Sequence, residues 1–200
     1  MYQEQSRAAG ESFFSFPAVA RRLRDPLLAG TYAATLVGMT GMVLLAVIGV
    51  GTSLLMWLIR EKVSASMAGI KYIDPARMPF MISMNLLEVA VMAVVGFFFL
   101  GHLRKLIKSV ADGDAFGQDN ARRLTWMGWL TLAANVLAMN VGGFGTWFAV
   151  LTHPQNPEFA ANPQSLAFNP SGWLLALVLF ILARVFKQGA SMNLDLEGTV

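Results

Sequence analysis

The chain contains no cysteine and only two histidines, His102 and His153, among its 200 residues. The lack of cysteine excludes a disulfide, a thiolate metal site and a cysteine nucleophile. Two histidines so far apart are too few for a zinc motif, and no nucleophile elbow occurs. We therefore expect no catalytic residue, no metal site and no cofactor, and the chain is predicted not to be an enzyme.

Charged residues are also scarce, at 14% of the chain, whereas hydrophobic residues make up 56%. Soluble domains carry about a quarter charged residues. Four long apolar segments dominate the sequence, at 36–59, 78–102, 124–151 and 171–183, and the second contains Glu88. A bilayer core about 30 Å thick needs about 20 mostly apolar helical residues, so the fourth segment requires its flanks. The pattern predicts an all-α integral membrane four-helix bundle over residues 31–192.

Basic residues predict the orientation of this bundle, because they are enriched in cytoplasmic loops. The segment 1–30, the loop between the second and third spans and the end of the fourth span are rich in arginine and lysine, and residues 153–170 contain neither. We therefore expect both termini in the cytoplasm and a multi-pass protein of the inner cell membrane. Residues 1–30 form a predicted cytoplasmic basic arm, and residues 193–200 form a predicted cytoplasmic tail.

Polar residues inside the predicted spans are the first candidates for a site, because an ionisable group in lipid is costly. The expected helix directions place residues from three spans at similar depth, in the outer third of the membrane. This predicted intramembrane cluster comprises Glu88, Asn85, Asn140, Thr52 and Ser53. One interpretation is a proton or cation site or an outward-facing ligand pocket. The alternative is a set of hydrogen bonds that hold the helices together.

Four short segments carry a resemblance to a known family. They are Gly-Asp-Ala-Phe at 113–116, Asn-Ala-Arg-Arg-Leu at 120–124, Arg-Val-Phe-Lys-Gln-Gly-Ala at 184–190 and Leu-Glu-Gly-Thr-Val at 196–200. With these segments the chain resembles DUF2975, a bacterial family of four-helix membrane proteins of unknown function, over roughly residues 36–200. The resemblance implies no established activity. It implies a link to a small Cro/CI-type helix-turn-helix regulator, which is encoded beside many members.

The leading hypothesis is a non-enzymatic regulatory or sensory membrane protein that acts through a cytoplasmic partner, with that regulator as one candidate. The predicted partner-binding residues are Arg104, Lys105, Arg122, Arg123 and Arg184. Two alternatives stay open: a transporter or channel component that uses Glu88, and a structural subunit of a membrane complex, including a homo-oligomer. The lipid bilayer is itself an expected partner. Direct nucleic-acid binding is not expected, because no basic face with interleaved aromatic residues occurs.

Overall fold

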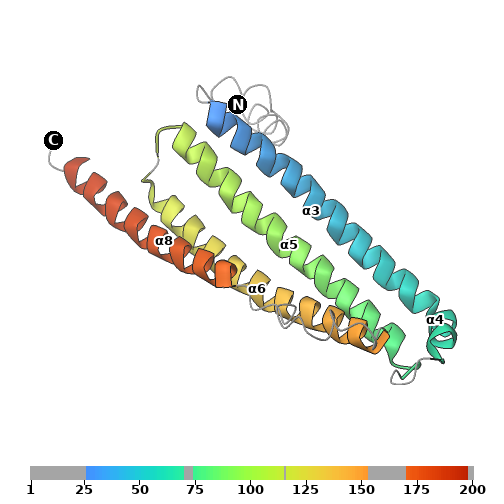
Figure 1. Ribbon diagram of the computed structural model, residues 1–200. Helices are drawn as coiled ribbons and strands as arrows, with labels where there is room; N and C mark the ends of the chain where they lie inside the picture. The colour runs from blue at the N-terminus through green and yellow to red at the C-terminus, as the bar shows by residue number, and fades with distance from the viewer. Residues whose placement is uncertain (1–25, 70–73, 115, 153–169, 198–200) are drawn as a thin grey trace, which may run out of the picture.

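The computed structural model describes residues 26–69, 74–114, 116–152 and 170–197, and this part of the chain contains helices and no strand. The helices are α3 (Pro26–Leu58), α4 (Arg60–Met67), α5 (Met78–Ala111), α6 (Gln118–Thr152) and α8 (Pro170–Glu197) (Figure 1). All but α4 are long and apolar enough to cross a membrane. The prediction of an all-α membrane protein with four spans is therefore confirmed.

The helices extend beyond the predicted apolar segments. α3 begins at Pro26, ten residues before the predicted span, and proline suits the first turn because that turn needs no N–H donor. α8 continues to Glu197, into the segment predicted as a tail. The apolar segments form the central parts of the helices, and their polar ends add further turns. Most of the predicted basic arm, 1–25, and most of the loop 153–170 lie outside the described residues.

α4 was not predicted, because its sequence is polar and only 8 residues long. It follows α3 after a bend at Ile59, whose ψ of 14° departs from helical geometry. Backbone hydrogen bonds still connect Ile59 to Leu55 at 3.0 Å and Val63 to Ile59 at 3.1 Å. α4 is therefore a bent continuation of α3 beyond the apolar span, and none of its residues is buried.

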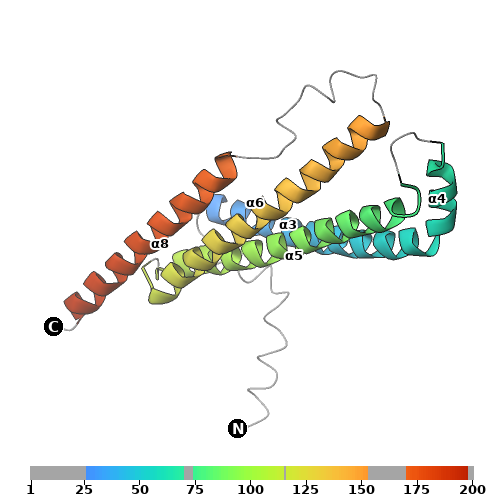
Figure 2. The same ribbon diagram turned by 90° about the horizontal axis from the view of Figure 1, so that it is seen from below.

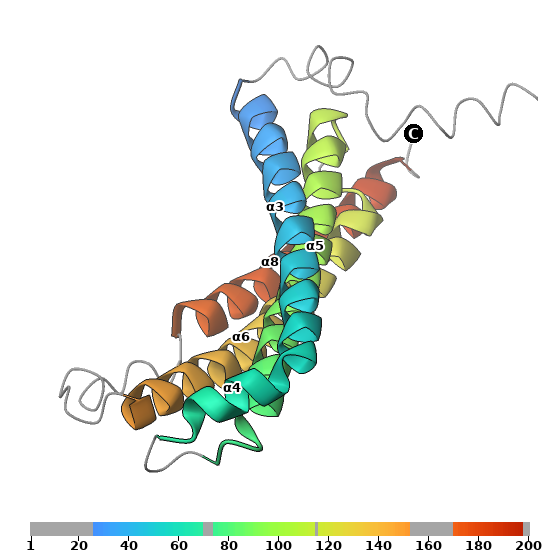
Figure 3. The same ribbon diagram turned by 90° about the vertical axis from the view of Figure 1, so that its right-hand side faces the viewer.

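The four long helices form two antiparallel pairs, α3 with α5 and α6 with α8, which meet where α5 packs against α6. Figure 2 shows the α6–α8 pair inclined to the α3–α5 pair, and Figure 3 shows the two pairs diverging toward α4. α3 and α5 approach closely at Gly49, where an added Cβ would lie 3.0 Å from the Ala90 Cβ. Gly41 of α3, by contrast, has open space around it.

The start of α3, the α5–α6 turn and the end of α8 lie together at one end of the molecule, which we call the turn end (Figures 1 and 3). α4 and the end of α6 lie at the opposite end, the α4 end. Buried apolar residues concentrate toward the turn end, where Leu124 and Met127 of α6 pack with Leu179 and Ala183 of α8. A second buried cluster joins Tyr32 of α3 to Ile107 of α5.

Candidate functional site

The α5–α6 turn begins with a hydrogen-bonded helix end. Gly113 has a φ of 87°, a left-handed conformation that glycine adopts without steric cost. Its N–H donates to the Val110 carbonyl oxygen at 3.1 Å, and the Asp114 N–H donates to the Ser109 carbonyl oxygen at 3.0 Å. These bonds form a Schellman motif, which satisfies carbonyl groups that the end of a helix leaves free. The Asp-Gly-Asp sequence at 112–114 is typical of such a turn.

Asn120, in the first turn of α6, connects this turn to α5. Its side-chain amide donates to the Ser109 hydroxyl at 2.8 Å and to the Asp114 carbonyl oxygen at 3.0 Å. Its side-chain oxygen accepts a hydrogen bond from the Arg123 guanidinium at 2.8 Å. The residue is 0% exposed. Asn120 therefore holds the two helices together and does not cap α6.

Two of the predicted partner-binding arginines are held within the protein. Arg123 donates to Asn120 and also lies 3.7 Å from the Asp119 carboxylate. The Arg104 Nε donates to the Tyr32 hydroxyl at 3.0 Å, and its guanidinium carbon lies 5.1 Å from the Tyr32 ring centre. Tyr32 is 5% exposed, so this contact fastens α3 to α5. Both arginines thus have a structural role at the turn end.

The other predicted partner-binding residues, Lys105, Arg122 and Arg184, are exposed. Lys105 lies on α5, where its backbone carbonyl oxygen accepts from Arg123 at 3.3 Å. Arg122 and Arg184 come from different helices and line the same pocket between α6 and α8. The structure therefore divides the five predicted residues into an internal pair, a pocket pair and one separate surface lysine.

Phe116 places the turn against α8. Its ring centre lies 5.4 Å from that of Phe186. A Cβ added at Gly189 would lie 2.7 Å from the Phe116 ring, so only glycine leaves room for this close approach. Two of the segments that resemble the family, 113–116 and 184–190, therefore contact each other, and a third, 120–124, supplies Asn120 beside them.

The predicted intramembrane cluster is not connected by hydrogen bonds in the part of the chain that the structure describes. Thr52 and Asn140 each donate to a carbonyl oxygen four residues earlier in their own helices, at 2.7 Å and 3.1 Å. Ser53 reaches across to a carbonyl oxygen of α5 at 3.0 Å. Asn85 and Glu88 are half-buried on α5 and form no hydrogen bond or ion pair with a described residue. The cluster itself stays a prediction.

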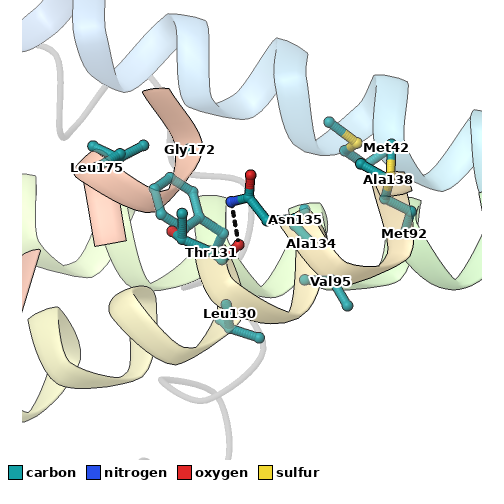
Figure 4. A pocket seen from close by; sticks show the side chains of 12 residues that line it. Met42, Met92, Val95, Leu130, Thr131, Ala134, Asn135, Ala138, Gly172 and Leu175 are labelled. Atoms are coloured by element: carbon teal, nitrogen blue, oxygen red, sulfur yellow. Dashed lines mark hydrogen bonds between the residues drawn. The ribbon is translucent and has the colours of Figure 1, made fainter. Parts of the chain in front are cut away.

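Sequence reasoning missed a different polar pair, Thr131 and Asn135 of α6. They are 8% and 9% exposed, and the Asn135 amide donates to the Thr131 carbonyl oxygen at 2.8 Å. They line a cavity of about 380 Å³ to which all four long helices contribute (Figure 4). Asn135 also packs directly against Gly172, at the start of α8. Two polar residues that lie four positions apart in an otherwise apolar helix share one helix face, and this spacing could have identified the pair.

These features define the class of protein: an all-helical, multi-pass membrane protein with four candidate spans. The chain belongs to DUF2975, a family of proteins of unknown function, whose family model matches residues 20–200. The family resemblance drawn from the motifs is thereby confirmed, and the match begins earlier than residue 36, within the predicted basic arm. No curated protein and no solved structure matches the chain.

Proposed function

We propose that this protein is a non-enzymatic regulatory or sensory membrane protein that binds a small cytoplasmic protein at its turn end. The α5–α6 turn carries the proposal, because buried Asn120 fixes its backbone while its outer side chains face solvent. These exposed charges, Lys105, Lys108, Asp112 and Asp114, are called the turn surface below. A surface that is already ordered loses little conformational entropy when a partner binds. Mixed charge on it favours selection of a complementary partner.

The cytoplasmic placement of the turn end is supported by its basic residues. Within the described residues, seven lysines and arginines lie there and three lie toward the α4 end. The chain lacks cysteine, so single cysteines can report the sidedness of each end. We expect Lys108→Cys to react with a membrane-impermeant maleimide only in opened cells, and Ser66→Cys of α4 to react in intact cells. The reverse pattern would overturn the orientation.

The regulator implied by the family resemblance is the first partner to test. Tagged protein should recover it from membranes of cells that express both. The variant Lys105→Glu/Lys108→Glu reverses two charges of the turn surface and should lower recovery at least tenfold, because charge complementarity with the partner is then lost. The matched control, Arg60→Glu/Lys62→Glu, reverses two exposed charges at the α4 end and should leave recovery unchanged. Equal recovery with both variants would reject the turn surface as the binding site.

A second candidate function is proton-coupled or cation transport through Glu88. It is favoured by one observation: the half-buried Glu88 carboxyl group lies within a span and has no hydrogen-bond or ion-pair partner among the described residues. Such a group in a membrane is by default a candidate for ion or proton handling. Purified protein in liposomes with an imposed proton gradient should then show flux that Glu88→Gln abolishes. Flux that survives this substitution would exclude Glu88 as the site.

A further inference from the structure

A large pocket lies between α6 and α8 near the turn end, with a volume of about 940 Å³. Three of the side chains that line it are cations, Arg122 from α6 and Arg184 and Lys187 from α8. Trp126 and Gln188, two residues whose side chains can donate hydrogen bonds, also line the pocket. The pocket is lined by no aspartate or glutamate among the described residues. Its chemistry is therefore that of a site for an anion with several acceptor oxygens.

None of the pocket's three cations forms an ion pair or a hydrogen bond within the described part of the chain. The neighbouring Arg123, by contrast, pairs with Asp119 and donates to Asn120. Cations on two helices that line one pocket repel each other, and an anion bound between them attracts both and offsets this repulsion. Guanidinium groups also match the geometry of phosphate oxygens.

The pocket lies at the boundary between the apolar and polar parts of the helices. Arg184 is the first charge after the apolar start of α8, and Arg122 lies two residues before the apolar segment 124–151 of α6. Trp126 is 51% exposed, and tryptophan is typical of the membrane–water interface. These positions, at the ends of apolar segments and beside a tryptophan, are those expected at the membrane–water interface, the level of lipid headgroups.

Apolar side chains continue from the pocket toward the membrane centre. Trp129 lies seven residues after Arg122, and Leu177 lies seven residues before Arg184, so each shares a helix face with its cation. These side chains are 59% and 55% exposed. Trp129 also packs edge-on against Phe180, at a ring-centre distance of 5.5 Å, which links the two helices below the cations. A lipid with its headgroup in the pocket would lay its acyl chains on this apolar surface.

We propose that the pocket between α6 and α8 binds the phosphate headgroup of an anionic phospholipid. Basic pockets between membrane helices bind headgroups in this way. The cations select the negative headgroup, while the exposed apolar face below them favours a lipid over a free anion. The proposal does not depend on the cytoplasmic partner, because its test contains no second protein.

The test is a titration of the purified full-length protein in detergent with short-chain phosphatidylglycerol, followed by native mass spectrometry. Phosphatidylcholine is the zwitterionic comparison. The unmodified protein should bind phosphatidylglycerol at least tenfold more tightly. The triple variant Arg122→Gln/Arg184→Gln/Lys187→Gln should lose this preference, at about fivefold in affinity per cation removed. The charge-retaining variant Arg122→Lys/Arg184→Lys should keep it.

A matched control removes three cations elsewhere. Arg60→Gln/Lys62→Gln/Arg77→Gln changes residues at the α4 end and should leave the lipid preference intact. Equal loss in this control, or an unchanged preference in the triple variant, would overturn the proposal. Displacement of the lipid by inorganic phosphate or by a glutamate-rich peptide at equal concentration would also overturn it, because the site would then take a free anion or a protein segment. Should the triple variant aggregate, Lys187→Gln alone must weaken binding about fivefold.

Discussion

Polar side chains form contacts at both ends of this molecule, but those at the turn end are buried and those at the α4 end are exposed. At the turn end, the amide of Asn120 is fully buried and bonds to both α5 and α6. At the α4 end, Arg77 and Asp74 form an ion pair at 3.2 Å whose side chains are 83% and 55% exposed. Water competes with exposed pairs and is excluded from buried ones. We therefore expect the turn end to have a fixed geometry and the α4 end to tolerate change.

The largest effect is expected from Asn120→Ala. It removes the three hydrogen bonds that Asn120 makes to Ser109, Asp114 and Arg123, and leaves Ser109 and Arg123 without this buried partner. The free energy of unfolding should fall by about 3 kcal/mol, because a polar group that loses its partner on burial carries the full desolvation cost. Thermal unfolding in detergent micelles, followed by circular dichroism, measures this change.

Asn140→Ala is the matched control for that prediction. It removes the same side chain from the same helix, but Asn140 is exposed and bonds only to its own helix, at the Val136 carbonyl oxygen. Its unfolding free energy should change by less than about 0.5 kcal/mol. Equal losses of unfolding free energy at Asn120 and Asn140 would show that burial at the turn end adds nothing to the stabilising effect of an asparagine.

The next effect tests the contact between the turn and α8. Gly189→Ala adds a Cβ 2.7 Å from the Phe116 ring and should destabilise the protein by about 1–2 kcal/mol, because the ring must move away. Gly101→Ala on α5 meets nothing within 4 Å and should stabilise the protein by about 0.5–1 kcal/mol through its helix propensity. Thermal unfolding measures both variants, and the same sign in both would contradict the close packing at Gly189.

A smaller effect is expected where α3 joins α5. Tyr32→Phe keeps the aromatic ring beneath Arg104 but removes the hydroxyl that accepts its hydrogen bond. The unfolding free energy should fall by about 1 kcal/mol. Thr40→Val is the control, because the Thr40 hydroxyl is exposed and donates only to its own helix. If Tyr32→Phe is as neutral as this control under thermal unfolding, the bond does not stabilise the α3–α5 pair.

The sequence was sufficient for the spans and for part of the turn. A run without charge such as 36–59 predicts a membrane helix, because lipid accepts only helices or closed barrels. Gly113 between two aspartates predicts the end of α5 for an equally local reason. α4 was not predicted because its eight residues, most of them polar, carry neither an apolar pattern nor a strong helix-start signal.

Less of the candidate site could be predicted from the sequence, because its contacts depend on how the helices pack. Asn120 and Ser109 are 11 residues apart on different helices, and only the folded turn brings them within 2.8 Å. Arg122 and Arg184 meet at one pocket through the same packing. The charge of Glu88 makes it the more conspicuous candidate in the sequence, although the neutral pair Thr131 and Asn135 is more buried. In these spans, the burial of a polar residue depends on the helix face it occupies and not on whether its side chain is charged.

The smallest effect is expected at the α4 end, and it separates ion-pair geometry from ion-pair stability. Arg77→Ala breaks the shorter of the two described ion pairs, at 3.2 Å, yet should change the unfolding free energy by less than about 0.5 kcal/mol because both partners are solvated. Arg123→Ala breaks the longer pair, at 3.7 Å, but should cost about 2 kcal/mol, because Arg123 is 24% exposed and also bonds to buried Asn120. Thermal unfolding of the two variants therefore shows whether the length of an ion pair or the burial of its residues determines its contribution to stability. A larger loss for Arg77→Ala would mean that the α4 end, not the turn end, contains the stabilising polar contacts.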